Sequence, residues 1–384
     1  MVGKPRAAIV AVAESDLGKT PGKTAVQLQA QAARRAVMEA GLTFKDIDGV
    51  FAHTDGVFPS LMITEYLGIK ATYTDSTAAG GLSNPSHVVH AIAAIEAGLC
   101  NVALITYGST QASDASRKLG GVPEDPRSPR SQFVTPYGQM TPLGYYAMAA
   151  RRHMYQYGTT SEQMAEVAVA ARKWAQLNPK AYRREPLTVE EVLSSQIIAE
   201  PLHVRDCCLV TDGGGAVIVT SVARAKLLRK KPVYILGAAE NQSHHFTPFD
   251  VKDWLDTGLA ATAQRAMQMA SVTQKDLDVV QIYDHFTIGV IQALEELGFC
   301  KRGEGGQFVT GGRIAPGGSF PLNTSGGGLS YGHPGMFGIF LIIEAVRQLC
   351  GECGERQVKD AKLALCQAAS LVFSAHTTLI LGRD

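Results

Sequence analysis

Apolar positions along the chain follow two patterns, short runs that are typical of buried strands and stripes with a helical period. The runs predict strands at residues 7–13, 48–53, 101–107, 216–220, 233–236, 279–282, 363–368 and 377–381. The stripes predict helices at residues 24–40, 60–67, 85–97, 143–157, 161–176, 187–194, 257–269, 288–297 and 337–348. Because helices alternate with strands, the pattern indicates an α/β protein whose mixed sheets are covered by helices.

The chain repeats itself. Residues 35–50 can be laid over residues 265–280 without a gap, and about half of the positions are identical. Both segments lie in the same strand–helix–strand order, so the repeat predicts two similar halves, residues 1–230 and 231–384. The first half also carries additions: a polar excursion at about 108–136 and a helical insertion at about 138–195.

Composition narrows the functional class. The formal net charge is +1, which argues against a nucleic-acid partner or a membrane surface. No apolar stretch approaches the roughly 20 residues of a membrane span, and the first residues lack the pattern of a signal peptide. Seven scattered cysteines suit reduced thiols in the cytoplasm. Cys350 and Cys353 form a lone CxxC without a second pair, so no metal site is expected.

Three side chains that can transfer protons follow one another where a strand passes into a helix. Tyr283, Asp284 and His285 come directly after the run at 279–282 and just before the stripe at 288–297. Ligands of α/β proteins bind at the carboxyl ends of strands, so this junction is a candidate catalytic site. The alternative is structural: Asp284 as a helix N-cap between two ordinary rings.

A second candidate segment is the glycine-rich stretch at 321–336. Glycines let a backbone approach a ligand and leave N–H groups that can face a carbonyl oxygen or a phosphate. A histidine held in a Gly-His-Pro-Gly frame before a helix is a candidate for catalysis, although a lone histidine is more often structural. The candidate residues of this stretch are Asn323, Gly326, Gly327, Tyr331, Gly332 and His333.

The duplicated halves, the NTSGG…GHPG stretch and the Tyr-Asp-His-Phe turn resemble the thiolase superfamily, and most closely its sterol-carrier-protein-type branch. The resemblance covers essentially the whole chain. It implies a five-layer αβαβα fold, an acyl-CoA substrate bound by loops of both halves, and a homodimer. Coenzyme A would then be part of the substrate, and no bound cofactor is expected.

The chain departs from a thiolase at the nucleophile. The resemblance places the catalytic cysteine at the start of the helix at 85–97, near Gly81, but no cysteine precedes Cys100. Gly80, Gly81 and Ser83 are therefore expected to bind substrate, and a serine acyl-enzyme is a minor alternative. Cys366 lies close to the position of the second catalytic cysteine, but the glycine-rich frame that should follow it is missing.

The Tyr-Asp-His-Phe turn is similar to thiolase-like aldolases that shorten steroid side chains and use tyrosines. Retro-aldol cleavage of a β-hydroxyacyl-CoA requires a base and an oxyanion site, and no acyl-enzyme. Tyr283 or Tyr331 could be the base or the proton donor, assisted by His285 or His333. Backbone N–H groups near Gly81 and Gly327 could complete the oxyanion site. The retained Gly-His-Pro-Gly motif departs from that branch and leaves the role of Tyr331 open.

Retro-aldol cleavage in the cytoplasm is therefore the first hypothesis. A thiolase or acyltransferase with an unusual nucleophile is the second, and a non-catalytic subunit that binds acyl-CoA is the third. The missing cysteine disfavours the second, and the retained tyrosines and histidines disfavour the third. The resemblance also implies a small partner protein with an OB-fold and a zinc ribbon.

Overall fold

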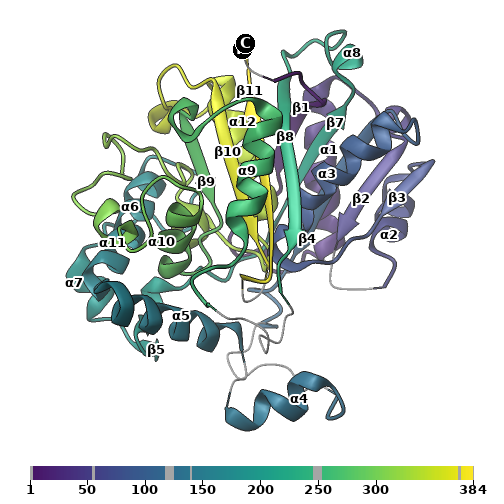
Figure 1. Cartoon of the computed structure of the whole chain (residues 1–384). Coiled ribbons are helices and arrows are strands. Elements are labelled where there is room, and N and C mark those ends of the chain that lie inside the picture. The colour runs from purple at the N-terminus through teal and green to yellow at the C-terminus, as the bar shows by residue number, and fades with distance from the viewer. Residues whose placement is uncertain are drawn as a thin grey trace.

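A computed structural model describes residues 3–53, 57–116, 125–138, 141–244, 253–370 and 373–383. Within these ranges, one mixed nine-stranded sheet runs through the molecule in the order β3-β2-β4-β7-β1-β8-β11-β10-β9 (Figure 1). Its strands are β1 Ala7–Glu14, β2 Gly49–His53, β3 Tyr73–Asp75, β4 Val102–Ser109, β7 Gly213–Thr220, β8 Val233–Gln242, β9 Val279–Ile282, β10 Leu363–Ala369 and β11 Ala375–Gly382. A separate hairpin pairs β5 Ile197–Ala199 with β6 Leu202–His203.

The two halves of this sheet have the same topology. In the first half β2 is parallel to β4, while β7 is antiparallel to both β4 and β1. In the second half β9 is parallel to β10, while β11 is antiparallel to both β10 and β8. The halves meet at β1 and β8, where Ala7 lies opposite Ile235 in an antiparallel pair. The expected mixed sheets are thus joined into one.

The repeated sequence segments form the same local structure. Asp46 accepts the backbone N–H of Thr43 at 2.9 Å, and Asp276 accepts that of Thr273 at 2.7 Å. Each capping box begins a short 3₁₀ turn that leads into the equivalent strands β2 and β9. The boundary predicted near residue 230 falls between the short helix α8 (Val222–Ala225) and β8, and it stays a prediction.

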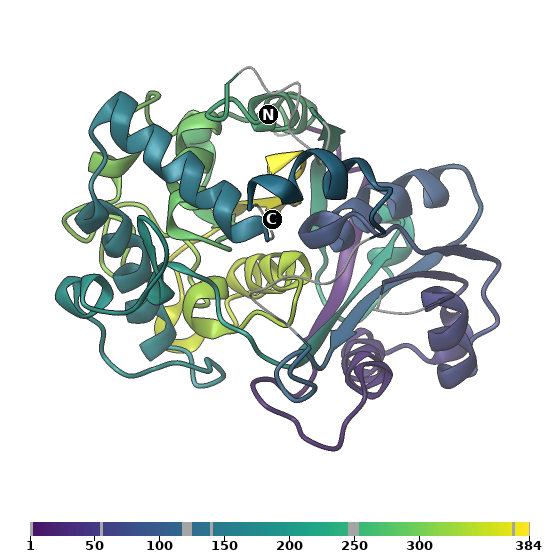
Figure 2. The same ribbon diagram turned by 90° about the horizontal axis from the view of Figure 1, so that it is seen from below.

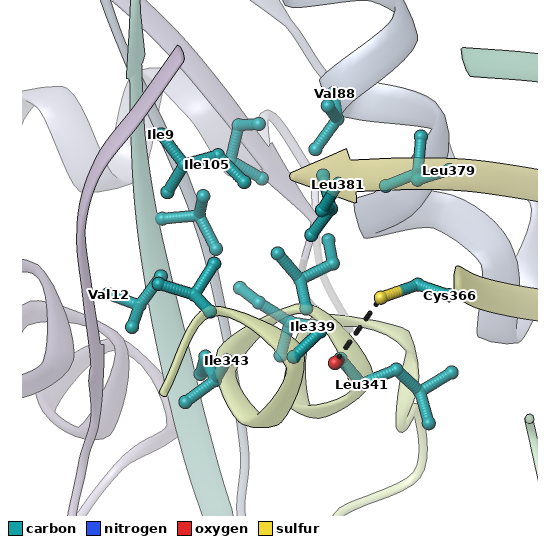
Figure 3. Close-up of a cluster of buried hydrophobic side chains, with 14 of the residues drawn as sticks. Ile9, Val12, Val88, Ile105, Ile339, Leu341, Ile343, Cys366, Leu379 and Leu381 are labelled. Atoms are coloured by element: carbon teal, nitrogen blue, oxygen red, sulfur yellow. Dashed lines mark hydrogen bonds between the residues drawn. The ribbon is translucent and has the colours of Figure 1, made fainter. Parts of the chain in front are cut away.

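Helices cover the sheet in layers. Helix α1 (Ala25–Ala40) packs on the outer face of the first half, and α9 (Leu259–Ala270) packs on that of the second half. Between the halves lie α3 (Ser83–Glu96) and α12 (Gly338–Cys350), which contact each other and strands of both halves. Figure 3 shows this central core, with Ile339 and Ile343 of α12 close to Val12 of β1. This is the five-layer arrangement that the sequence predicts.

Of the remaining helices, α2 packs against β2 and β3 of the first half, and several others surround one end of the second half. Helices α5 and α6 pack against α10, and α6 also packs against the glycine-rich loop, so the insertion lies over the second half (Figure 2). Part of the polar excursion, residues 117–124, lies outside the described residues; a short helix, α4, follows it. None of the described helices is long and apolar enough to cross a membrane. The bounds are α2 Pro59–Leu67, α4 Pro129–Phe133, α5 Pro142–Tyr157, α6 Ser161–Gln176, α7 Val189–Leu193, α10 Thr287–Glu296 and α11 Gly305–Phe308.

The burial of α12 between the two halves predicts that a core substitution there destabilises the protein more than a surface substitution does. Ile339 is fully buried between the halves, so Ile339→Ala leaves a cavity there and should lower the free energy of unfolding by about 2–5 kcal/mol. Urea denaturation measures this change. Leu227 is 85% exposed, so Leu227→Ala is the control and should change the same quantity by less than about 0.5 kcal/mol. Similar losses in both variants would contradict the central position of α12.

Candidate active site

The backbone of Tyr283 is fixed from two sides at the carboxyl end of β9. The N–H of Ile282 donates to Oδ1 of Asn323 at 2.8 Å, and the N–H of Tyr283 donates to the carbonyl of Gln367 at 3.0 Å. Asn323 has φ +50° and follows Leu322, which bridges to Val280 of β9. The side-chain oxygen of Asn323, expected to contact substrate, therefore holds the strand end that carries Tyr283.

The hydroxyl of Tyr283 lies between a histidine and the start of a helix. Its oxygen is 3.0 Å from Nε2 of His333, and it accepts the backbone N–H of Phe337 at 3.0 Å. Phe337 is the N-cap of α12, where the helix dipole favours negative charge. Tyr283 and His333 are both buried, so these contacts act with little screening by water. The Phe337 N–H is therefore a donor that would stabilise negative charge on the phenolic oxygen.

The position expected for the thiolase cysteine faces this hydroxyl. A Cβ atom built on Gly81 would lie 2.6 Å from the hydroxyl oxygen and two ring carbons of Tyr283. Tyr283 thus fills the space that a side chain at residue 81 would need. Gly80 has φ +72°, and the nearby Ser83 accepts the N–H of Ala79 and donates to the carbonyl of Gly80. Both of these hydrogen bonds of the Ser83 hydroxyl stabilise the turn.

His333 is oriented by its neighbours. Its backbone N–H donates to Oγ1 of Thr211 at 2.9 Å, and its ring stacks on Phe337 with centroids 6.1 Å apart. Gly332, just before it, has an extended backbone, and a Cβ there would lie 3.3 Å from the Thr211 hydroxyl. Gly332 therefore allows the close approach of Thr211 that positions His333.

The side chain of Asp284 holds the glycine-rich loop in place. This carboxyl group is fully buried and accepts the N–H groups of Gly328 at 2.7 Å and Leu329 at 3.2 Å. These residues belong to a π-helical turn at Gly327–Tyr331. Burial raises the pKa of Asp284 to about 8, against the effect of the two N–H donors. Asp284 therefore positions the loop, and its expected role in proton transfer stays a prediction.

The glycines of this loop are needed for packing. Gly327 has φ +61°, and a Cβ there would lie 1.9 Å from Oδ2 of Asp284. Its N–H donates to Oγ of Ser325 at 3.2 Å, and the oxyanion site expected from N–H groups near Gly81 and Gly327 stays a prediction. Gly326 has φ +103° and lies against Ala175 of α6.

Tyr331 turns away from Tyr283. Its hydroxyl donates to Oε1 of Glu14 at 3.5 Å, and its ring packs on Phe337 and Phe340. Burial, with the negative charge of Glu14, holds the pKa of Tyr331 well above its usual value. A phenol with a raised pKa is a poor base, so we favour Tyr283 over Tyr331, and the catalytic role expected of Tyr331 stays a prediction.

His285 lies on the second-half side of Tyr283. Its Nδ1 is 3.2 Å from the carbonyl oxygen of Tyr283, and its ring meets that of Tyr146 edge-to-face at 4.2 Å. The rings of His285 and Tyr283 are 5.3 Å apart, and both line one small cavity. The structure therefore brings together Tyr283, His285, His333 and the Gly81 turn.

Cys366 is part of the core. Its thiol donates to the carbonyl of Leu341 at 3.5 Å, and Figure 3 shows the sulfur pointing toward α12. Complete burial raises its pKa above the usual value, which disfavours the thiolate. Cys366 is therefore not placed as a nucleophile.

Comparisons with known proteins identify the family. The profile of the family described as "Thiolase C-terminal domain-like" matches residues 239–383. The 17-hydroxy-3-oxo-4-pregnene-20-carboxyl-CoA lyase of Mycobacterium tuberculosis is 35% identical over 361 residues, covering 90% of this chain and 92% of the lyase. The chain belongs to the thiolase superfamily.

This thiolase-superfamily chain has relatives of two chemical kinds. An acetyl-CoA acetyltransferase of Methanothermobacter thermautotrophicus is 33% identical over 371 residues, covering 93% of this chain and 94% of the relative. A solved structure named "Ltp2-ChsH2(DUF35) aldolase" matches with a TM-score of 0.90 at 32% identity, covering 99% of this chain and 98% of that chain. The predicted fold and the resemblance to thiolase-like aldolases are confirmed.

The sequence pattern did not reveal the Phe337 N–H or the role of Gln367. Phe337 stands two residues after the Gly-His-Pro-Gly motif, so the predicted start of a helix there was the available signal. Gln367 stands at the end of β10, beside the strand that carries Tyr283, but only the pairing of β9 with β10 brings the two together.

Gly81 is the position where the fit of Tyr283 can be tested. A methyl group in Gly81→Ala would overlap the Tyr283 hydroxyl, so the ring should move and the contact with His333 should break. A crystal structure of the variant measures the distance between Tyr283 Oη and His333 Nε2. Gly41→Ala is the control: its φ of +69° strains the C-cap of α1, but nothing lies within 4 Å of a Cβ there, so the distance between Tyr283 and His333 should not change. An unchanged distance in Gly81→Ala would contradict the proposed fit.

The buried Asp284 predicts a pH dependence of stability. Its pKa is raised to about 8 in the folded state, so between its ordinary pKa of about 4 and pH 8 the folded protein binds a proton that the unfolded chain releases. The free energy of unfolding should therefore fall as pH rises through this window, by up to about 1.4 kcal/mol per pH unit for one proton.

Urea denaturation between pH 5.5 and 8.5 measures this slope. Asp284→Asn should reduce it, because residue 284 no longer titrates. It should also lower stability by about 1–3 kcal/mol, because one buried loop N–H loses its acceptor. The same slope in both proteins would show that another group is responsible.

Proposed function

We propose that this thiolase-superfamily protein catalyses retro-aldol cleavage of a β-hydroxyacyl-CoA without a covalent acyl-enzyme. The single observation that carries the proposal is the position of Tyr283, whose hydroxyl contacts His333 and lies against Gly81, where a thiolase would place its cysteine. A protein that positions a phenol and a histidine there has the groups for proton transfer and lacks the group for acyl transfer.

In this mechanism Tyr283 is the base. Its oxygen is favoured in the anionic form by the Phe337 N–H and by His333. It removes the proton of the substrate β-hydroxyl, the C–O bond becomes a carbonyl, and the electron pair of the Cα–Cβ bond moves into the thioester as an enolate. Proton return to Cα gives a shorter acyl-CoA and an aldehyde or ketone. His333 is the proposed donor to the charge that develops on the thioester oxygen, and His285 is proposed to support the negative charge on Tyr283.

The relatives support this choice. One is named a CoA lyase and the solved structure is named an aldolase. The acetyltransferase relative makes acyl transfer the second candidate. Acyl transfer through an enzyme-bound intermediate needs a nucleophile, yet Gly81 has no side chain, Ser83 holds a turn and Cys366 faces the core. Coenzyme A enters only as part of the substrate, and no resident cofactor is part of the proposal.

We also propose two protein partners. A homodimer is supported by exposed apolar side chains on α2 and just before it, beside the edge strand β3. These side chains are Val57, Phe58, Leu61, Met62 and Tyr66. The name of the solved relative includes ChsH2(DUF35), which supports a small OB-fold and zinc-ribbon partner here. A cytoplasmic location stays a prediction.

Two matched variants test the function. The purified protein is incubated with β-hydroxyacyl-CoA and β-ketoacyl-CoA esters, including steroid side-chain esters, with and without free CoA, and products are read by mass spectrometry. We expect a shorter acyl-CoA and a carbonyl product from the β-hydroxy esters without free CoA. Tyr283→Phe should lower this rate by about 100-fold or more. Tyr331→Phe, the same change at the tyrosine that faces Glu14, should keep most of it.

Other outcomes would contradict the proposal. CoA-dependent cleavage of the β-keto esters would establish the acyltransferase instead. No turnover of any ester, also after addition of a small OB-fold partner protein, would favour the non-catalytic acyl-CoA-binding subunit.

A further inference from the structure

A small cavity of about 10 Å³ lies on the α10 side of Tyr283. A volume of this size is enough for about one water molecule, provided that several polar groups surround it. The polar side chains that line the cavity are Thr257, Tyr283, His285, Gln292, Glu296, Gln367 and His376. Gln292 and Glu296 are among those that have no part in the mechanism described above.

One face of α10 carries this wall of the cavity. Gly289, Gln292 and Glu296 are spaced by three and four residues, so they lie on the same side of the helix. Gly289 makes room for the imidazole: a Cβ there would lie 3.0 Å from Cε1 and 3.4 Å from Nε2 of His285. The edge of the His285 ring that carries Nε2 therefore packs against the face of α10 that carries Gln292 and Glu296.

The contact of Nδ1, the other ring nitrogen of His285, determines which tautomer is present. Nδ1 lies 3.2 Å from the carbonyl oxygen of Tyr283, which can only accept a hydrogen bond. Nδ1 therefore carries a hydrogen, and Nε2 is the nitrogen that gains or loses a proton.

Gln292 presents a polar atom that the described protein does not satisfy. Its side chain is 2% exposed, and its Nε2 donates to the carbonyl of Trp254 at 3.2 Å. Its Oε1 makes no hydrogen bond to any described residue. A buried amide oxygen that lines a water-sized cavity is what a bound water needs as one of its partners.

Glu296 is a largely buried carboxyl group at the end of the same face. It accepts the N–H and hydroxyl of Thr257 and the N–H of Leu259, and no described basic side chain pairs with it. Burial raises its pKa to about 7, and the nearby Asp256 acts in the same direction. From β11, His376 faces the same cavity, and burial lowers its pKa to about 4, so it is neutral near pH 7.

We propose that Glu296 exchanges a proton with Nε2 of His285 through one water held by Gln292 in this cavity. The carboxyl O–H gives its proton to the water as the water gives one to Nε2, which leaves a carboxylate and an imidazolium. The imidazolium lies beside Tyr283, with ring centroids 5.3 Å apart, and favours the phenolate. Glu296 is thus a positioning residue that acts through His285, and this role in catalysis rests on the proposed function.

The helix supplies its own control. Glu295, the preceding residue of α10, is also buried, but its carboxylate lies 3.1 Å from Nε2 of His153 and accepts the N–H of Gly305. Glu295 therefore contacts a different histidine from the one proposed to exchange a proton with Glu296. Glu296→Gln should affect His285, and Glu295→Gln should affect His153.

The first test is NMR titration of the histidine side chains in the full chain, with the His285 signal assigned from His285→Asn. This measurement needs no substrate, so it stands even if the aldolase proposal fails. Glu296→Gln should move the titration midpoint of His285 to lower pH by about one unit, because the counter-charge is gone. Gln292→Met, which removes the water ligand and keeps Glu296, should move it in the same direction. Glu295→Gln should leave His285 unchanged.

The second test is the pH profile of cleavage. Wild type should gain activity through an inflection near pH 7, where Glu296 ionises. Glu296→Gln should remove that inflection and lower kcat at pH 7 by about tenfold, whereas Glu295→Gln should keep it. A His285 midpoint that is unchanged in both Glu296→Gln and Gln292→Met, or that moves equally in Glu295→Gln, would overturn the proposal.

Discussion

The site depends on a single steric fit, that of the Tyr283 side chain against Gly81. Residue 81 can have no side chain, because even a methyl group would overlap the phenol. The hydroxyl then contacts both Nε2 of His333 and the backbone N–H of Phe337, the N-cap of α12. One tyrosine in place of a thiol therefore changes the chemistry, since a phenol that accepts the Phe337 N–H and contacts Nε2 of His333 is suited to proton transfer, and the nucleophile is lost.

The duplicated fold explains how distant segments meet at this point. Tyr283 follows β9, and its backbone N–H donates to the carbonyl of Gln367 on the neighbouring strand β10. Gly81 lies just before α3 and Phe337 just before α12, and these two helices lie together between the halves of the sheet. Asp284 then fixes the π-helical turn that leads to His333. The chemistry thus lies in loops, while the strands and the central helices determine their distances.

The regular elements could be predicted because their signals are local. The apolar run at 279–282 matches β9, and the stripe at 288–297 differs from α10 by one residue at each end. Strand β8 was predicted to end at 236 but extends to Gln242, because its polar second part pairs with β11. The π-helical turn was not predicted, since it depends on a carboxylate more than 40 residues earlier in the chain.

The candidate residues were found as a group, but their roles could not be assigned from sequence. Tyr283 and Tyr331 look equivalent in the sequence, yet one faces His333 and the other Glu14. Asp284 and His285 are adjacent, yet one carboxylate holds a loop while the imidazole lines a cavity. These differences come from the directions in which side chains leave the backbone, which only the tertiary structure determines.

The central claim is that C–C cleavage here needs no covalent acyl-enzyme. Intact-protein mass spectrometry during turnover of a β-hydroxyacyl-CoA tests it most directly. We predict that the mass of the protein stays unchanged while the shorter acyl-CoA accumulates. A protein species heavier by the mass of the acyl group, formed and lost at the rate of turnover, would contradict the account and identify a nucleophile that the structure does not suggest.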